Sequence, residues 1–239
     1  WARLLISGLI IGGVYSLVAI GYTLVYGILR MINFAHGEVM MVGTFAGYLM
    51  LEATKSIMVP TPDNSPLSFS NAYPVITVIL AFLVGMIVAA ATGYFLEKIA
   101  YRPLRKAPRL IPLISAIGAS IFLQNFAQLL FSPQTRDYVN PDVISRGAGW
   151  KLMINGSQVI LPYTGVLTFF LSILLMVGLF LMIKKTKLGK AMRAVAMDKS
   201  TAALMGIDVN VIISRTFIIS GALAGSAGVM CGVHNGLVY

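Results

Sequence analysis

Two groups of polar residues interrupt apolar sequence, and their types and spacing suit ligand binding. The first group lies in INFAHGE, residues 32–38, and comprises Asn33, His36, Gly37 and Glu38. A half-helix beginning here would direct its unpaired N–H groups and positive dipole end toward a pathway, which suits a carboxylate. In the alternative, Asn33 caps an ordinary helix, Glu38 complements its dipole near the headgroups, and His36 is interfacial.

The second group recurs every four residues within an apolar run and comprises Ser120, Gln124 and Gln128. Residues spaced by four lie on one face of a helix. Polar side chains at such positions are costly unless they meet water or a hydrogen-bonding partner. They therefore either line a pathway or bond to neighbouring helices.

Signatures of covalent catalysis are absent from the sequence. The motifs HExxH, GxSxG, CxxC, GxGxxG and GxxxxGK[ST] do not occur, and the two histidines lie far apart at positions 36 and 234. We expect no bound cofactor, no metal site and no enzymatic reaction in this chain. If ATP drives its function, another subunit must bind the nucleotide.

The composition predicts an integral membrane protein, because 58% of the 239 residues are hydrophobic and the mean hydropathy is +0.86. A spanning helix needs about 20 apolar residues. Such runs cover residues 4–29, 74–96, 110–131, 162–183 and 211–233. Alternating strand patterns are absent, so we expect an all-α polytopic helical bundle, a single transmembrane domain over residues 1–239.

The apolar run 39–51 is too short to cross a membrane as it stands. Either it is a re-entrant half-helix, which gives a broken helix near residues 31–51, or it is the middle of a span over residues 34–58. In the second case the first residue lies outside the cell, and in the first case it lies inside.

The basic residues orient the bundle, because Lys and Arg in short loops stay on the cytoplasmic side. Of the 18 basic residues, 11 lie in the loops 98–109 and 184–199. Both loops should be cytoplasmic, and the loops 52–73 and 132–161 should face the other side. The net charge of +10 does not indicate nucleic-acid binding, because interleaved aromatic residues are lacking. Membrane topology and anionic lipid explain the charge better.

The segment 184–209 is a basic, helix-patterned stretch held between two spans. Its first part predicts a helix whose apolar face consists of Leu188, Met192, Val195 and Ala196. Asp198 or Ser200 can cap a second short helix over 201–205 that Gly206 ends in the left-handed conformation. Either this helix offers exposed Leu204, Met205 and Ile207 to a groove in a partner, or it lies on the membrane surface.

Glycines at four-residue spacing place two positions without side chains on one helix face. The pairs are Gly8 with Gly12, Gly43 with Gly47, Gly221 with Gly225, and Gly228 with Gly232. Together they predict close packing of helices.

Three stretches carry a family resemblance: GGVYSLVAIGYTLVYGILRMINFAHGEVMMVG (12–43), EKIAYRPLRKAPRLIPLISAIGASIFLQN (97–125) and GKAMRAVAMDKSTAALMGIDV (189–209). They resemble the permease subunits of branched-chain amino acid ABC transporters, in particular the LivH-like half. The match covers about a third of the chain closely and most of it in hydropathy order. The family continues past residue 239, and the chain starts at Trp1, so we expect it to be part of a longer permease.

The resemblance implies an importer in the bacterial inner membrane that works by alternating access. The implied partners are a second, LivM-like permease, two cytoplasmic ATPases, a periplasmic amino-acid-binding protein and membrane lipid. The implied ATPase-coupling residues are Ser200, Thr201, Ala202, Ala203, Leu204, Met205, Gly206 and Ile207. The general importer loop has Glu-Ala-Ala, three residues and Gly, whereas TAALMG has Thr201 in the Glu position.

Three alternatives remain at this point. Related permeases with similar NFAHGE stretches handle urea or short-chain amides. A self-sufficient secondary carrier or channel would need no ATPase. A noncatalytic scaffold would tolerate changes of the intramembrane polar residues.

Overall fold

The computed structural model describes residues 2–60, 67–105, 107–108, 110–132, 134–138, 141, 149–154 and 157–238. The helices are α1 (Ala2–Leu29), α2 (His36–Ser56), α3 (Phe69–Ala72), α4 (Pro74–Leu96), α5 (Leu110–Phe131), α6 (Tyr163–Lys185), α7 (Lys187–Met197), α8 (Lys199–Leu204) and α9 (Val209–Asn235). A π-helical turn (Glu97–Tyr101) and a 3-10 turn (Arg102–Leu104) follow α4.

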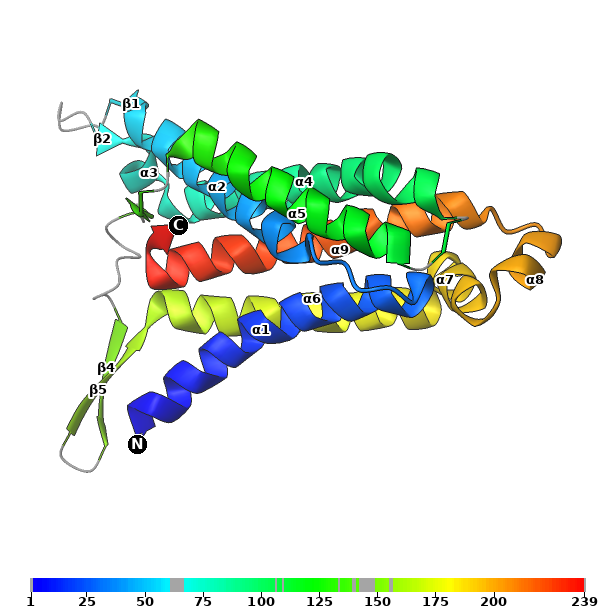
Figure 1. Cartoon of the computed structure of the whole chain (residues 1–239). Coiled ribbons are helices and arrows are strands. Elements are labelled where there is room, and N and C mark those ends of the chain that lie inside the picture. Colours follow the sequence, from blue (N-terminus) through cyan, green and yellow to red (C-terminus); the bar gives the residue numbers. More distant parts are fainter. Residues whose placement is uncertain are drawn as a thin grey trace.

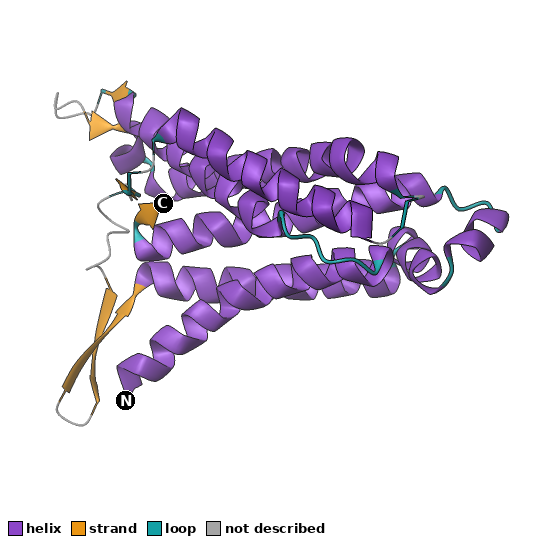
Figure 2. Ribbon diagram, viewed as in Figure 1, coloured by secondary structure: helices purple, strands orange, loops and turns teal. Residues whose placement is uncertain are grey.

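Short antiparallel pairs of strands gather at one end of the bundle (Figure 2). The strands are β1 (Met58–Val59), β2 (Leu67–Ser68), β3 (Arg136–Asp137), β4 (Gly149–Ile154), β5 (Ser157–Pro162) and β6 (Leu237–Val238). The pairs are β1 with β2, β3 with β6, and β4 with β5, the last in the register Gly149 opposite Pro162.

Five helices of the described part are long and apolar enough to cross a membrane. Apart from Pro162, they contain the five runs that the sequence singles out, and they run side by side along the bundle (Figure 1). The fold class predicted from the sequence, an all-α polytopic membrane protein, is confirmed.

The uncertain run 39–51 lies within one continuous helix, α2, of 21 residues. Residues 30–35 return from the end of α1 to the middle of the bundle, where α2 begins before running to the strand-bearing end (Figure 1). The helix is therefore not confined to residues 39–51, and its bounds are close to the alternative over residues 34–58. The start of α1 lies at the strand-bearing end.

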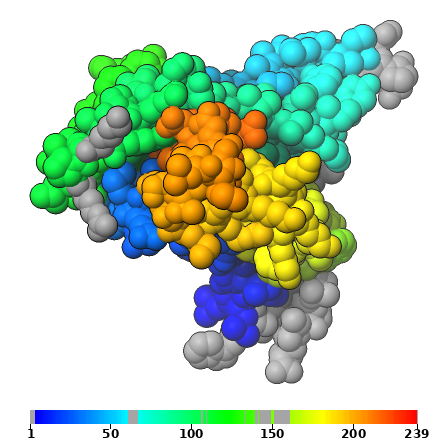
Figure 3. All heavy atoms as spheres, turned by 90° about the vertical axis from the view of Figure 1, so that its right-hand side faces the viewer, coloured from blue at the N-terminus to red at the C-terminus, as the bar shows by residue number. Residues whose placement is uncertain are grey.

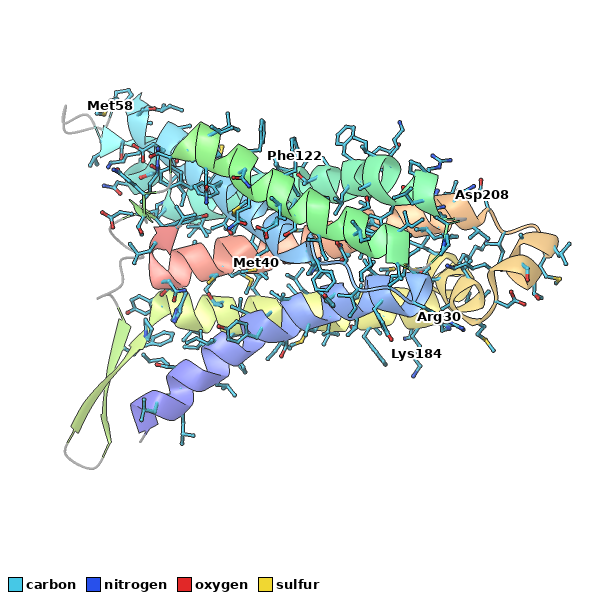
Figure 4. All side chains as sticks on the ribbon, in the orientation of Figure 1. Arg30, Met40, Met58, Phe122, Lys184 and Asp208 are labelled. Carbon is cyan, nitrogen blue, oxygen red and sulfur yellow. The ribbon has the colours of Figure 1, made fainter. Side chains whose placement is uncertain are left out.

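The basic loops lie together at the opposite end of the bundle. Arg30, Lys184 and Asp208 mark this end, whereas Met58 marks the strand-bearing end (Figure 4). The distribution of Lys and Arg predicts that the end with α7 and α8, which we call the cytoplasmic end, faces the cytoplasm. Lys106 and Arg109, which belong to one of these loops, lie outside the described residues.

The centre of the bundle is α9, whose span is mostly buried, whereas α5 and α6 are mostly exposed. Close contact with α2 and α4 depends on glycine: a Cβ on Gly225 would lie 2.5 Å from the Ala89 Cβ and 2.5 Å from the Gly85 carbonyl oxygen. A Cβ on Gly43 would lie 2.5 Å from the Gly225 Cα. The pair Gly8 and Gly12 is different, because nothing lies within 4 Å of either added Cβ.

Gly225→Val should therefore destabilise the bundle, because its new side chain meets backbone and a methyl group that cannot withdraw. We expect a loss of about 1–3 kcal/mol or more in the free energy of unfolding. Gly12→Val is the matched control and should change it by about 0.5 kcal/mol or less. Denaturation midpoints in detergent measure both variants, and equal midpoints would contradict the packing described.

Candidate functional site

A cavity of about 330 Å³ lies between α2 and α5. It is lined by Glu38, Met41, Phe45, Gln124, Ala127, Gln128, Ser132 and Gln134. Polar and apolar side chains both line it, and the volume is at the small end of the about 300–1,000 Å³ of ligand pockets. The cavity can accommodate a small molecule that has both charged and aliphatic groups.

Glu38 joins the two predicted groups of polar residues. The Ser120 hydroxyl donates to the Glu38 carboxylate at 2.9 Å, which ties the first turn of α2 to α5. A carboxylate in the first turn of a helix is stabilised by the helix dipole. Glu38 thus has its interhelical partner and still contributes to the cavity wall.

Gln124 and Gln128 are exposed side chains on a helix that should lie within a membrane. Both line the cavity, one turn apart. The neighbouring Asn125 does not line it, and its amide donates at 2.7 Å to the Ile121 carbonyl oxygen of the same helix. Because polar groups within a membrane are costly without hydrogen bonds, the exposed glutamine amides on this face of α5 require contact with water or with a further protein partner.

Asn33 and His36, the other predicted pathway residues, turn into the core. The Asn33 amide oxygen accepts from the Ala35 N–H at 3.1 Å and from the Tyr101 hydroxyl at 2.7 Å. This bonding resembles the capping role considered in the sequence analysis, although Ala35 is the residue that directly precedes α2. The Asn33 oxygen holds the chain where α2 begins.

His36 is only 2% exposed, so it is not interfacial. It packs edge-on against Tyr22, and its Nδ1 lies 3.5 Å from the Ser220 hydroxyl. Neither the cavity between α2 and α5 nor the smaller one that Gly37 lines contains it. The smaller cavity, of about 180 Å³, lies between α2 and α9. The structure therefore brings Glu38, Ser120, Gln124 and Gln128 together and separates them from Asn33, His36 and Gly37.

The segment 184–209 folds as two short helices, as its pattern predicts. The apolar face of α7 packs on the core through buried Met192 and Val195, and through partly buried Leu188 and Ala196. Thr186 caps this helix by accepting from the Gly189 N–H at 3.1 Å. Lys190 and Arg193 remain exposed.

Asp198 caps α8, and the two capping alternatives are thereby resolved. Its carboxylate accepts from the Ser200 N–H at 2.8 Å and from the Thr201 hydroxyl at 2.6 Å. These bonds lower the pKa of Asp198 well below its usual range, with the Thr201 hydroxyl as the largest cause. The cap is therefore complete at neutral pH and is lost only when the pH falls through this depressed pKa.

The helix α8 ends in a left-handed glycine, as expected: Gly206 has a φ of 82°. The Ile207 N–H donates to the Ala202 carbonyl at 3.1 Å, and the Gly206 N–H donates to the Ala203 carbonyl at 3.0 Å, which is a Schellman motif. Asp208 then caps α9 by accepting from the N–H groups of Asn210 and Val211.

The tip of α8 exposes two large apolar side chains, Leu204 at 87% and Met205 at 79%. Ile207, which we expected to be exposed, is partly buried against the core, and Ala202 is buried. Ser200, Thr201, Ala203 and Gly206 are exposed. Because α8 extends beyond the ends of the membrane helices (Figure 1), the tip is accessible to a partner in the cytoplasm.

Sequence reasoning missed a buried ion pair at the cytoplasmic end. The Glu97 carboxylate is fully buried, pairs with the Arg105 guanidinium, and accepts from the Ser214 hydroxyl at 2.6 Å. Arg105 also donates to the Asn210 side chain. The signal in the sequence was Glu97 itself, the lone acid of a basic loop, eight residues before Arg105 with Pro103 between them.

Comparison with known proteins gives one consistent result. The family described as "Branched-chain amino acid transport system / permease component" matches residues 4–238. The permease protein BraD of the high-affinity branched-chain amino acid transport system of Pseudomonas aeruginosa is 41% identical, over 98% of this chain and 71% of its own length. The corresponding protein LivH of Escherichia coli K12 is 36% identical, over 97% and 70%. No solved structure matches the chain.

Proposed function

Because the chain belongs to the family of branched-chain amino acid transport permease components, we propose that it is a membrane-spanning subunit of an ATP-driven importer for branched-chain amino acids. The observation that supports this assignment most directly is the family match across residues 4–238. The chain catalyses no covalent chemistry in this proposal and binds no cofactor, and ATP is hydrolysed in partner subunits.

The proposed assembly lies in the bacterial inner membrane. It contains a second, LivM-like permease, two cytoplasmic ATPases and a periplasmic amino-acid-binding protein. Two exposed features support this composition. The glutamine amides of α5 require water or a partner within the membrane, and the apolar tip of α8 requires a partner to cover it. The second permease would complete the α5 side of the pathway, and an ATPase would receive the α8 tip.

The cavity between α2 and α5 would receive the substrate on its way across. An aliphatic amino acid carries an ammonium, a carboxylate and an apolar side chain. Glu38 is suited to the ammonium, Met41 and Phe45 to the side chain, and the amides of Gln124 and Gln128 to further hydrogen bonds. Asn33 and His36 would act as positioning residues that fix where α2 begins.

Transport would follow alternating access. Closure of the ATPases upon ATP binding would move α8, and the movement would pass to α9 through Gly206, Ile207 and the cap of Asp208. The start of α9 bonds to the turn after α4 through Ser214 and Glu97, and Tyr101 of that turn bonds to Asn33. A continuous series of contacts thus connects the α8 tip to the start of α2.

Glu38→Gln should lower the apparent affinity for leucine in uptake about tenfold or more, because it removes a charge-assisted hydrogen bond to the ammonium. Glu52→Gln is the matched control, since Glu52 is an exposed carboxylate at the far end of the same helix. Uptake by the reconstituted complex measures both. Unchanged rate and affinity in Glu38→Gln, with assembly intact, would exclude Glu38 from the site.

Competition identifies the substrate class. Leucine, isoleucine and valine should each compete for uptake, whereas urea and short-chain amides should not, because a neutral amide lacks the ammonium that Glu38 would bind. Inhibition of uptake by vanadate should be complete. Competition by urea would favour the amide permeases of this family, and uptake that resists vanadate would favour a secondary carrier.

A further inference from the structure

A second pocket, of about 440 Å³, lies at the cytoplasmic end and is separate from the cavity between α2 and α5. It lies between the end of α1, the start of α5 and the junction of α7 with α8. Its lining residues are Ile28, Leu29, Arg30, Met31, Arg105, Ala107, Pro112, Val195, Ala196, Met197, Asp198, Lys199 and Ser200. Figure 3 looks onto this end, where the blue, green and orange segments meet.

Three cations converge on this pocket, which we call the cationic pocket: Arg30, Arg105 and Lys199. The pKa of Lys199 is lowered by burial first, and then by the charges of Arg105 and Arg30. The Lys199 ammonium is therefore close enough to both guanidinium groups to be repelled by them. An anion placed among the three would relieve this repulsion.

The carboxylates nearby leave part of this charge uncompensated. Asp198 lines the pocket as an ionised carboxylate whose oxygens accept hydrogen bonds from Ser200 and Thr201, so it offsets one of the three cations. Glu97 is occupied by Arg105 and Ser214, and the Arg105 Nε remains buried without a hydrogen-bond partner among the described residues. Three cations, Arg30, Arg105 and Lys199, therefore stand against two carboxylates, Asp198 and Glu97, which leaves an excess of one positive charge among these five groups.

Arg30 is fixed in place by its own contacts. Its guanidinium donates to the carbonyl oxygens of Ala196 and Met197, each at 3.3 Å, at the end of α7. Its φ of 55° is left-handed, which is unfavourable for a residue with a side chain. This conformation ends α1, because Arg30 directly follows Leu29 and its N–H donates to the Tyr26 carbonyl at 2.7 Å.

The remaining wall of the pocket is apolar. Ile28, Leu29, Pro112 and Val195 are buried residues of this wall. Leu29 is the last residue of the α1 span, and Pro112 lies in the first turn of the α5 span, so the pocket lies at the depth where the apolar spans end. This depth is that of the lipid headgroups in the cytoplasmic leaflet.

We propose that the cationic pocket binds a phosphate-bearing anion, supplied by the headgroup of an anionic phospholipid or by free phosphate. The apolar wall at headgroup depth favours the lipid, because it would also receive the first methylenes of an acyl chain. Basic pockets between membrane helices on the cytoplasmic side bind lipid headgroups in this way. The bound phosphate bridges α1, the loop after α4 and the start of α8, and so stabilises the position of the α8 tip.

The test uses the purified, assembled transporter. The thermal unfolding midpoint is measured with short-chain phosphatidylglycerol, with phosphatidylcholine of the same chain length, and with inorganic phosphate, and lipid retained by the complex is counted by native mass spectrometry. Phosphatidylglycerol should stabilise the wild-type complex more than phosphatidylcholine does. Lys199→Gln should bind it about fivefold more weakly, the effect of one cation near a membrane surface.

Matched variants separate this site from general surface charge. Lys199→Arg should retain binding, and Lys199→Glu should abolish it. Lys190→Gln removes the same charge from an exposed position of α7 that does not line the pocket, and it should bind like the wild type. Lys199 is exposed at the pocket mouth, so Lys199→Arg should unfold at the wild-type temperature when no lipid is added, and Lys199→Gln, which relieves the repulsion among the cations, should unfold no lower.

Each outcome decides the proposal. Stabilisation by phosphatidylglycerol alone supports the lipid source, and equal, competing stabilisation by inorganic phosphate supports free phosphate. Binding of phosphatidylglycerol that is unchanged in Lys199→Gln and Lys199→Glu would overturn the proposal. Loss of the ATPases from Lys199→Gln with lipid retention unchanged would also overturn it, since the cations would then serve a protein partner. None of these outcomes depends on which substrate is transported.

Discussion

Replacing Leu204 and Met205 together by aspartate is expected to release the ATPase subunits while leaving the permease folded and in the membrane. These two side chains form the exposed apolar tip of α8, and neither packs on the permease core. Buried anchors at protein interfaces contribute about 2 kcal/mol or more each, so the double change should weaken association about a thousandfold. Co-purification of the ATPases with the permease measures the effect directly.

The matched control is Lys190→Asp, which changes the net charge by the same amount as the double change. Lys190 is an exposed residue of α7 that lies outside both the α8 tip and the cationic pocket. Its variant should retain the ATPases in stoichiometric amount. If the Leu204 and Met205 variant also retains them, the tip is not the docking site, and the cytoplasmic contact must lie elsewhere on the permease.

The membrane helices could be predicted from the sequence because their physical signal is local. Charge-free runs such as 74–96 and 162–183 contain nearly all of α4 and α6, and the basic loops indicate which end is cytoplasmic. The caps of α8 and α9 could also be predicted, because Asp198 and Asp208 bond to residues that are their neighbours in sequence. Local chemistry determines each of these features.

The arrangement of the polar residues could not be predicted in the same way, because it depends on distant packing. Glu38 meets Ser120 across 82 positions, and His36 is buried because Gly21 leaves room for its ring and Ser220 lies nearby. A sequence pattern shows that His36 and Glu38 are polar and only two residues apart. It does not show that His36 is buried in the core beside α1 and α9, whereas Glu38 lines the cavity beside α5.

The same limit applied to the pair Glu97 and Arg105, for which a large effect of mutation is expected. Arg105→Met should destabilise the permease by about 3–5 kcal/mol, because it leaves a fully buried carboxylate without its counter-charge. Among the described residues, the Ser214 hydroxyl would remain as the hydrogen-bond donor to that carboxylate. Denaturation midpoints and the yield of folded protein in detergent measure the loss.

Two further variants test whether the uncompensated charge is the cause. Arg102→Met changes an exposed arginine of the same loop and should alter stability by about 0.5 kcal/mol or less. Adding Glu97→Gln to Arg105→Met removes the buried charge and should recover most of the lost stability, since a neutral amide needs no counter-ion. If the double variant is as unstable as Arg105→Met, then Arg105 acts mainly through its contact with Asn210 at the start of α9. Recovery of stability would instead assign the cost to the Glu97 carboxylate, at the turn that also holds Tyr101 against Asn33 where α2 begins.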